Sequence, residues 1–543
     1  MATKTAAYDY VVVGAGSAGC VLAGRLSEQP DTSVLLLEAG KPDEKREISI
    51  PAAFSELFKS EYDWEYYTEP QPEMNDRELY WPRGKTLGGS SSINAMIYIR
   101  GHARDYDEWA SLGNDGWGYE DVLPYFKRNE GFRPSEKRSL LGGSNASEAD
   151  VEYHGTDGPL AVSNPQSPNP LSETFVDAAV EAGYDRNPDF NGETQAGVGK
   201  YHLTQKDGKR HSAADAYLKP ALDRRNLTVE TGAQATEIRF DGDRATGVEY
   251  RQDGTDLYAE ATEEVLVSAG AVNSPQLLMC SGIGDPDHLA EHDIEPTAEL
   301  PGVGRNLQDH LFSFVVYETN ESETLDDAGR IRDLAKFFLL KRGLLTSNVG
   351  EAGGFVRTDP DLDAPDLQFH FAPGYFMNHG FDNPADGHGL SLGATQLRPE
   401  SRGRISLRSA DPFDDPAIDP NYLDADKDLD VLVEGVKRGR EIMQADAFDD
   451  VRGKEVWPGE DVQTDEEIVE HVRETAHTVY HPVGTCKMGD DDMAVVDDRL
   501  RVHGLDGLRV VDASVMPTLT GGNTNAPTMM IAEKAVDMIR EDR

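Results

Sequence analysis

A single histidine near the carboxyl end of the chain is a candidate for proton transfer. His481 opens the segment HPVGTCKMG, residues 481–489, and a neutral imidazole can remove a proton near physiological pH. His477 precedes it with HxxxH spacing, which can also indicate zinc ligands. Because Pro482 would disturb a helical zinc site and no Glu follows His477, we expect no metal here and a structural role for His477.

A glycine-rich turn at the amino end has the spacing of a phosphate-binding loop. Gly14, Gly16 and Gly19 form GxGxxG between an apolar strand predicted over 10–13 and a helix predicted from about Ser17. The glycines would turn the chain, admit a pyrophosphate to the backbone and let helix and strand approach closely. The first turn of the helix would offer unpaired N–H groups and the positive end of its dipole.

A carboxylate and two more glycine-rich segments accompany this turn. Glu38 ends the next predicted strand, 19 residues after Gly19, where it could accept hydrogen bonds from a ribose diol and would repel a 2′-phosphate. Segment 84–101 could lie against a flat ring. Segment 270–284 follows the strand-like run EEVLVSAG and is expected to begin a helix at about 274–275. The GxGxxG unit predicts a dinucleotide and leaves FAD and NAD open.

A helix is expected at the carboxyl end, from Asn525 through about Ile539. An asparagine cap, Pro527 in the first turn and the amphipathic run TMMIAEKAVDMI support it. Its positive end would point toward whatever lies beside Asn523 and would stabilise a negative charge there by about 0.3 to 2 kcal/mol.

The charge balance is strongly acidic. In 543 residues, 52 Lys and Arg stand against 99 Asp and Glu, a formal net charge of -47 at pH 7. Such a surface repels nucleic acid phosphates and anionic lipid, so we expect neither as a partner. The acidic residues are dispersed along the chain, which suggests a solvated coat suited to a salt-adapted, halophilic cytoplasm.

Cysteine usage and apolar runs indicate a cytoplasmic protein. Cys20, Cys280 and Cys486 are widely spaced, so neither a disulfide framework nor a zinc ribbon is expected, and Cys486 is interpreted as a packed thiol. The first ten residues lack the apolar core of a signal peptide. No apolar run approaches 18 residues, so no stable membrane insertion is expected.

Together these segments resemble the glucose-methanol-choline (GMC) family of FAD-dependent oxidoreductases. The resemblance extends to PGVGRNLQDH (301–310), RPESRGRISLRSADP (398–412) and the closing run 510–539, and so spans nearly the whole chain. It implies an α/β fold with an α+β substrate lobe: a Rossmann-like FAD-binding domain and a second domain built on an antiparallel sheet. The strand-like alternation of DLQFHFAPGYF and GRISLRSA agrees with such a sheet.

The resemblance also implies domain boundaries. The FAD-binding domain would comprise 1–160, 201–310 and 464–543, and the substrate-binding domain 161–200 and 311–463. The Ser/Glu/Gly-rich stretch 134–155 is expected to be a mobile excursion near the boundary between them.

The implied chemistry is oxidation of a small-molecule alcohol by hydride transfer to flavin N5. His481 would be the general base, and Asn523 would hold the substrate oxygen. The residues implied to bind FAD are Gly14, Gly16, Ser17, Ala18, Gly19, Glu38, Ala39, Leu87, Gly88, Gly89, Ser90, Asn94, Ala95, Ala233, Asp512, Ala513, Asn523 and Asn525.

Two positions depart from parts of the family. Ile93 stands where some members attach the flavin through a histidine, so we expect non-covalent FAD. The carboxyl-terminal half is most similar to the choline dehydrogenase branch, which pairs a glutamate with the quaternary ammonium, but Phe312 stands at that position. An uncharged primary or aromatic alcohol, a sugar or a polyol is then as plausible as choline.

Alternative functions are a lyase that uses FAD structurally, of the hydroxynitrile type, and choline dehydrogenase proper. The electron acceptor is left open between oxygen, a quinone and another carrier.

The acidic coat predicts a dependence on salt. At molar KCl the Debye length falls to about 3 Å, which screens the mutual repulsion of surface carboxylates. We therefore expect the melting temperature and the activity to rise across a KCl series, followed by thermal unfolding and by alcohol oxidation. Equal stability in low salt would count against salt adaptation.

Overall fold

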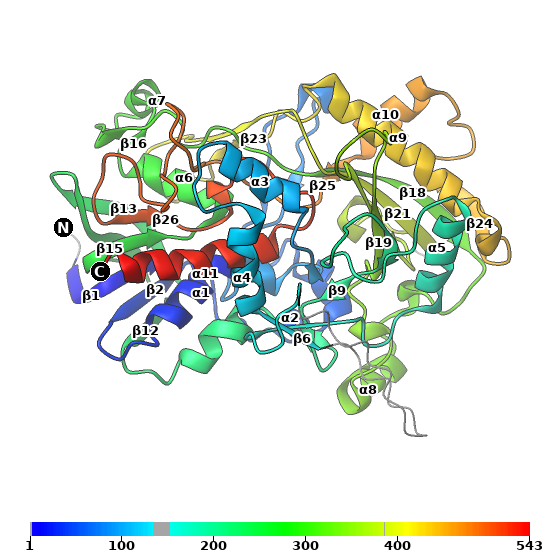
Figure 1. Ribbon diagram of the computed structural model, residues 1–543, viewed down its shortest axis with the longest axis horizontal. Helices are drawn as coiled ribbons and strands as arrows, with labels where there is room; N and C mark the ends of the chain where they lie inside the picture. The colour runs from blue at the N-terminus through cyan, green and yellow to red at the C-terminus, as the bar shows by residue number, and fades with distance from the viewer. Residues whose placement is uncertain (1–2, 134–151, 385) are drawn as a thin grey trace.

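Two seven-stranded sheets organise the protein, one toward each end of its long axis (Figure 1). The computed structural model describes residues 3–133, 152–384 and 386–543, so most of the expected excursion, 134–151, lies outside the described residues. None of the described helices is both long and apolar enough to cross a membrane.

The first sheet has a parallel core with an antiparallel ribbon at one edge. Its strand order is β12-β2-β1-β15-β14-β13, and β26 pairs with β15. The strands β12, β2, β1, β15 and β26 run parallel, whereas β13 and β14 are antiparallel. Their bounds are β1 Thr3–Val13, β2 Val34–Glu38, β12 Leu227–Thr231, β13 Ala233–Asp241, β14 Arg244–Gln252, β15 Thr255–Val267 and β26 Leu508–Val510.

The glycine turn after β1 connects this sheet to helix α1, Ser17–Leu26. A Cβ atom at Gly19 would lie 1.8 Å from the carbonyl oxygen of Gly14, so the helix can approach the strand only because position 19 has no side chain. The turn and the helix start therefore lie where the sequence predicted them, and the strand ends at Val13 as predicted but begins at Thr3, seven residues before the predicted start.

Helix α11, Asn525–Glu541, packs beside α1 and is buried on nearly every side (Figure 1). The helix predicted from Asn525 through about Ile539 is therefore confirmed, but the polar side of its amphipathic pattern is buried as well. The charge of Glu533, which is fully buried, is compensated because its carboxylate accepts hydrogen bonds from Arg25 and Tyr217 and forms an ion pair with Arg128. Tertiary partners allow a polar residue to face inward here.

The second sheet is antiparallel throughout, as expected for the substrate lobe. Its order is β24-β18-β21-β20-β19-β8, and β25 pairs with β18. Helix α9, Asp426–Met443, packs on β18 and β21, and α5, Pro170–Glu181, packs on β8 and β19. The strand bounds are β8 Gly197–Lys200, β18 Leu311–Thr319, β19 Ala352–Val356, β20 Leu367–Ala372, β21 Gly389–Gln396, β24 Arg452–Trp457 and β25 His477–Thr478.

Both segments with strand-like alternation do contain strands, but in different sheets. DLQFHFAPGYF contains β20, whereas GRISLRSA contains β22, Arg404–Ser406, which pairs with β23, Ala417–Asp419, in a separate ribbon. Every strand of the first sheet falls within the ranges proposed for the FAD-binding domain, and so does β25 of the second sheet.

Smaller elements fill the space around the sheets. A four-stranded sheet, β5-β9-β7-β6, contains Ile97–Tyr98, His202–Leu203, Leu160–Ser163 and Glu130–Arg133. The other helices that matter below are α2 Arg46–Ser49, η1 Pro51–Leu57, η3 Gly89–Ser92, α3 Ala103–Ser111, α4 Tyr119–Asn129, α6 Gly270–Cys280, α7 Pro286–Glu291, α8 Ile331–Leu340 and α10 Asp465–Thr475.

Candidate active site

A long cavity is lined by residues from both large sheets. Val13 and Leu37 contribute to it from β1 and β2, whereas Phe312 and His370 contribute from β18 and β20. Most residues expected to act on a cofactor or substrate line this one space: Gly14, Gly16, Ser17, Ala18, Glu38, Ala39, Gly89, Ser90, Asn94, Ala95, Ala233, His481, Asp512, Ala513, Asn523 and Asn525.

Three of the expected cofactor-binding residues do not line the cavity. Gly19 packs against Gly14 behind the turn. The backbone N–H of Gly88 donates to the carbonyl of Ala15, and the carbonyl of Leu87 accepts from the hydroxyl of Ser92. These residues lie behind the cavity wall and hold the lining segments in place.

Two helices begin at the cavity beside one another. The hydroxyl of Ser17, the first residue of α1, donates to the side-chain carbonyl of Asn525, the first residue of α11, at 2.7 Å. Asn525 is therefore inside the helix and Thr524 occupies the N-cap position, so the expectation that Asn525 caps the helix was wrong. Both positive helix ends face the same space, which favours a ligand with negative charge.

The expected start of helix α6 also needs correction. The helix begins at Gly270, about one turn earlier than the expected 274–275, and Pro275 lies inside it. The carboxylate of Asp512 accepts hydrogen bonds from the N–H of Gly270 and the hydroxyl of Ser274, at 2.8 and 2.6 Å. A residue 242 positions away in sequence thus satisfies the first turn of the helix.

Glu38 lies at the end of β2 with its carboxylate in the cavity wall. Its two oxygens accept from the N–H groups of Ala15 and Gly40, each at 2.8 Å, and each oxygen keeps a lone pair for a ligand. Burial raises the pKa of Glu38 to about 7, although these backbone hydrogen bonds oppose the rise. The carboxyl group can therefore serve the ribose hydroxyls proposed for it.

The lining residues fit FAD. The hydroxyl of Ser268 lines the cavity and is buried without a hydrogen-bond partner among the described residues, so a polar ligand atom would satisfy it. A Cβ at Gly16 would meet a single neighbouring atom, at 4.0 Å, which leaves its backbone open to a phosphate. The glycine turn, the paired helix ends and Glu38 complete a dinucleotide cradle.

His481 lies in the other half of the cavity, where a hydrogen bond from its own backbone N–H holds it. Its N–H donates to one oxygen of Asp309 at 2.7 Å, and the second oxygen of Asp309 accepts from the hydroxyls of Thr478 and Tyr422. Burial raises the pKa of Asp309 to about 6. Because Asp309 precedes β18 and Thr478 lies in β25, the second sheet positions the imidazole.

The hydrogen bonds of His310 determine which nitrogen of His481 carries the proton. Burial lowers the pKa of His310 to about 3, so its ring is neutral. Its Nε2 lies 3.0 Å from the carbonyl of Leu397, which can only accept, so Nε2 carries the hydrogen and Nδ1 is an acceptor. His310 Nδ1 lies 2.9 Å from His481 Nδ1, which must therefore be the donor.

The Nε2 atom of His481 is consequently unprotonated and turned toward Asn523. Burial, with the neighbouring His310, lowers the pKa of His481 well below its usual value, so the ring stays neutral at physiological pH. Asn523 Nδ2 donates to His481 Nε2 at 3.2 Å. A lone pair and an amide N–H thus face one another.

Gln368 orients the amide of Asn523. Its Nε2 donates to Asn523 Oδ1 and to the hydroxyl of Tyr201, each at 3.2 Å. Since the oxygen of Asn523 is engaged in this way, its N–H groups point toward His481. Sequence reasoning missed Gln368 and Tyr201, and it named His310 only as part of a motif, because nothing local marks a residue that contacts a partner more than 150 positions away.

Aromatic rings form the cavity wall near His481. Phe58 contacts Tyr480 and Phe54, and Phe376 contacts Phe54 and Phe314, with ring centroids 5.6 to 6.1 Å apart. Phe312 lies 4.4 Å from Phe314. The carboxylates among the described lining residues are Glu38 and Asp512, and neither belongs to this wall.

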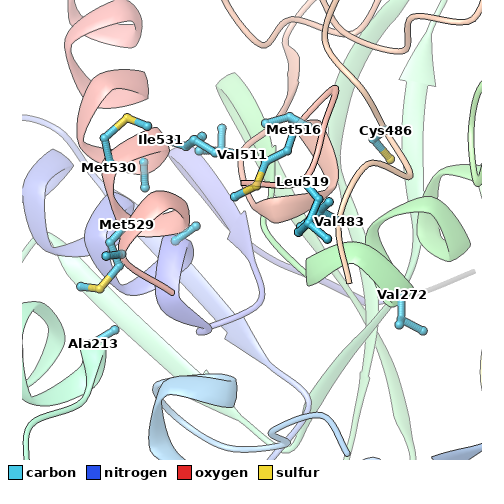
Figure 2. Close-up of a cluster of buried hydrophobic side chains, with 14 of the residues drawn as sticks. Ala213, Val272, Val483, Cys486, Val511, Met516, Leu519, Met529, Met530 and Ile531 are labelled. Atoms are coloured by element: carbon cyan, nitrogen blue, oxygen red, sulfur yellow. The ribbon is translucent and has the colours of Figure 1, made fainter. Parts of the chain in front are cut away.

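Two residues near His481 in the sequence, His477 and Cys486, are packed inside the protein. The ring of His477 packs against Phe312 and Phe314, and the clusters of described residues that could share a cation include neither His477 nor His481. Cys486 lies in a buried apolar cluster with Met516 (Figure 2). Burial raises the pKa of the Cys486 thiol well above its usual value, which confirms a packed thiol.

Comparison with known proteins identifies the family. The model of the GMC oxidoreductase amino-terminal region matches residues 8–312, and that of the carboxyl-terminal region matches 399–532. The chain is 47% identical to an alcohol dehydrogenase [acceptor] of Pseudomonas putida, covering 98% of this chain and 95% of that protein. It is 46% identical to oxygen-dependent choline dehydrogenase 1 of Chromohalobacter salexigens, covering 99% and 96%.

Solved structures agree with this assignment. Pyridoxine 4-oxidase from Mesorbium loti superposes with a TM-score of 0.88 at 33% identity, covering 98% of this chain and 99% of that one. The formate oxidase of Aspergillus oryzae, studied for FAD modification, gives 0.91 at 28% identity, covering 100% and 99%. The chain therefore belongs to the GMC oxidoreductase family and is an FAD-dependent oxidoreductase that acts on alcohols.

Proposed function

We propose that this protein oxidises an uncharged alcohol with an apolar carbon chain to the aldehyde or ketone. His481 acts as the general base and Asn523 holds the substrate oxygen. The observation that carries the proposal is the unprotonated Nε2 of His481, held opposite an amide donor in the cavity that also contains the dinucleotide cradle.

The base works because its Nε2 is already unprotonated before the substrate arrives, and the substrate hydroxyl would take the place of Asn523 as the hydrogen-bond donor to it. The Nε2 atom of His481 takes the hydroxyl proton, and its Nδ1–H remains bonded to His310, so the ring need not change tautomer. General-base catalysis of this kind contributes typically about 10² to 10⁴ in rate, or roughly 3 to 5 kcal/mol of the barrier. Bound FAD supplies the hydride acceptor at N5.

Asn523 would stabilise the oxygen while it carries extra charge. Its amide N–H is already oriented by Gln368, so it need not reorganise during the reaction. The reaction requires His481 and Asn523 to contact the same substrate oxygen. They can do so because their facing atoms are 3.2 Å apart.

The wall of rings supports the choice of substrate. Phe312 replaces the carboxylate expected for choline, and a ring face attracts a quaternary ammonium more weakly than a full negative charge. The wall offers few donors and acceptors for the hydroxyls of a sugar or polyol, because Phe54, Phe58, Phe314 and Phe376 dominate it. An aliphatic or aromatic primary alcohol suits it best.

The acidic composition supports a separate proposal, that the enzyme works in a salt-rich cytoplasm. The KCl series described above tests it.

Replacing His481 with Ala should slow flavin reduction by about 10² or more, because the general base is lost while the cradle is untouched. Loss of the 450 nm absorbance after anaerobic addition of alcohol measures the rate, and the FAD content of the purified variant serves as a control. The remote variant His292→Ala should reduce its flavin normally. A near-normal rate of flavin reduction in His481→Ala would contradict the role of His481 as the general base. Substrate turnover without bleaching of the flavin would point to the lyase alternative.

Variants of His310 test the tautomer argument. Leu at this position cannot accept from His481 Nδ1, so we expect kcat to fall about tenfold or more with little change in KM. Gln can accept from His481 with its oxygen and donate to the Leu397 carbonyl with its nitrogen, so His310→Gln should recover part of that loss. Equal kcat values for the two variants, at equal FAD content, would refute the tautomer role.

We further propose that FAD is bound without a covalent bond. Ile93 is 3% exposed and lines the cavity next to η3, but its side chain has no nucleophilic atom. Acid precipitation should therefore release all the yellow colour into the supernatant. Flavin that remains on the washed polypeptide would contradict this.

The aromatic wall predicts substrate preference. We expect kcat/KM for benzyl alcohol or 1-octanol to exceed that for choline by about 10² or more. Phe312→Glu should raise the choline to benzyl alcohol ratio of kcat/KM about tenfold through the restored charge, and Phe312→Gln, which has nearly the same volume as Glu, should not. A wild-type enzyme that prefers choline would argue for choline dehydrogenase proper.

A further inference from the structure

Helix α8 carries an exposed apolar surface on the outside of the protein. It projects from the edge of the fold near the second sheet (Figure 1). Phe337 on its inner side is buried against Ala53 and Leu345. The three residues that follow it, Phe338, Leu339 and Leu340, are 47%, 81% and 65% exposed. The two leucines are the most exposed large apolar side chains among the described residues.

The same segment is positively charged, whereas the protein as a whole is negatively charged. Residues 330–342 contain five basic residues and one acidic residue, whereas acidic residues outnumber basic ones nearly two to one in the whole chain. All five basic residues are exposed: Arg330, Arg332, Lys336, Lys341 and Arg342. Arg46 of α2, which is also exposed, adds a further cation by stacking on Phe338, with its guanidinium carbon 4.5 Å from the ring centre.

Part of this positive charge is free of local ion pairs. Lys341 pairs with Asp207 at 3.0 Å, and Arg330 and Arg332 pair with neighbouring aspartates. No carboxylate among the described residues forms an ion pair with Lys336 or Arg342. Exposed pairs are weak and readily exchange partners, so all five cations can turn toward an external anion.

We propose that α8 docks this protein on an anionic lipid surface. A bilayer offers anionic headgroups for the Lys and Arg side chains and hydrocarbon for Phe338, Leu339 and Leu340, the combination that interfacial amphipathic helices recognise. Nucleic acid offers the charge without the hydrocarbon. A symmetric pair of copies joined through α8 would place five cations against five cations.

The net charge of the whole chain does not prevent this contact. The Debye length is about 8 Å at about 0.15 M salt and about 3 Å at the molar salt proposed above, so under both conditions carboxylates on distant faces are screened from the lipid, and the groups of the α8 face that touch the lipid decide. Under this proposal the α8 face would be an exception to the general expectation that the acidic coat excludes anionic lipid.

The docked face adjoins the cavity. The short helix η1 links them: its Ala53 belongs to the same buried apolar cluster as Phe337 of α8, and its Phe54 lines the cavity. An apolar alcohol dissolved in the bilayer would then be released close to the aromatic wall. This consequence rests on the proposed function, whereas the docking itself does not.

Co-sedimentation with vesicles tests the docking on the full-length flavoprotein. We expect wild type to bind vesicles of equal parts phosphatidylcholine and phosphatidylglycerol, in about 0.15 M KCl, and to bind pure phosphatidylcholine at least tenfold more weakly. The double variant Leu339→Glu, Leu340→Glu should lose about tenfold or more in binding. The pair Lys336→Glu, Arg342→Glu should lose the preference for phosphatidylglycerol.

The matched control is Leu222→Glu, which adds a charge at another leucine that is 49% exposed and should bind as wild type does. Melting temperature and FAD content establish that each variant is folded, and oxidation of a water-soluble alcohol should be unchanged, so failure of docking and failure of the proposed chemistry are read separately. Wild type that ignores phosphatidylglycerol vesicles would overturn the proposal, as would undiminished binding by the α8 variants. An α8-dependent dimer without vesicle binding would reassign the face to self-association.

Discussion

The candidate site depends on one hydrogen-bond chain that leaves a nitrogen lone pair where a proton must be accepted. A peptide carbonyl cannot donate, so the carbonyl of Leu397 forces the hydrogen of His310 onto Nε2, and His310 in turn forces the hydrogen of His481 onto Nδ1. The polarity of the chain is therefore determined by the backbone. A neutral imidazole in water would divide its proton between the two nitrogens, and burial of this chain removes that freedom.

Both large sheets are needed for this arrangement, and neither holds the site alone. The second sheet supplies His310 just before β18, Gln368 on β20 and Leu397 just after β21. The first sheet supplies the glycine turn and Glu38, and it supports the paired starts of α1 and α11. Asn523 lies just before α11 and is hydrogen-bonded to both His481 and Gln368, so it joins the end of the cavity at the helix starts to the end that contains His481.

The charge differs between the surface, the interior, the aromatic wall and helix α8. The overall surface is strongly acidic, and inside the fold the buried charge of Glu533 is compensated by Arg25, Arg128 and Tyr217. The aromatic wall near His481 is free of carboxylates among the described residues that line it. Helix α8 combines exposed hydrocarbon with local positive charge, which the rest of the acidic chain does not predict.

The sequence by itself determined the local units and the family. The strand over 10–13, the glycine turn, the helix from about Ser17, the position of Glu38 and a helix from Asn525 all follow from periodicity and from residues within a few positions of one another. Resemblance of motifs identified His481 and Asn523 as candidates. These features were accessible because each depends on neighbours in the chain.

Tertiary structure decided the features whose partners are distant in sequence. Helix α6 starts at Gly270 because Asp512 caps it, and α11 is buried on nearly every side because Glu533 finds its counter-ions on α1 and α4. The protonated nitrogen of His481 depends on His310, 171 residues away, and on Leu397, which is 87 residues from His310 in the sequence. Periodicity within a segment does not show which distant side chains come within 3 Å of one another in the folded protein. Only the packed structure could therefore show which nitrogen of His481 is unprotonated.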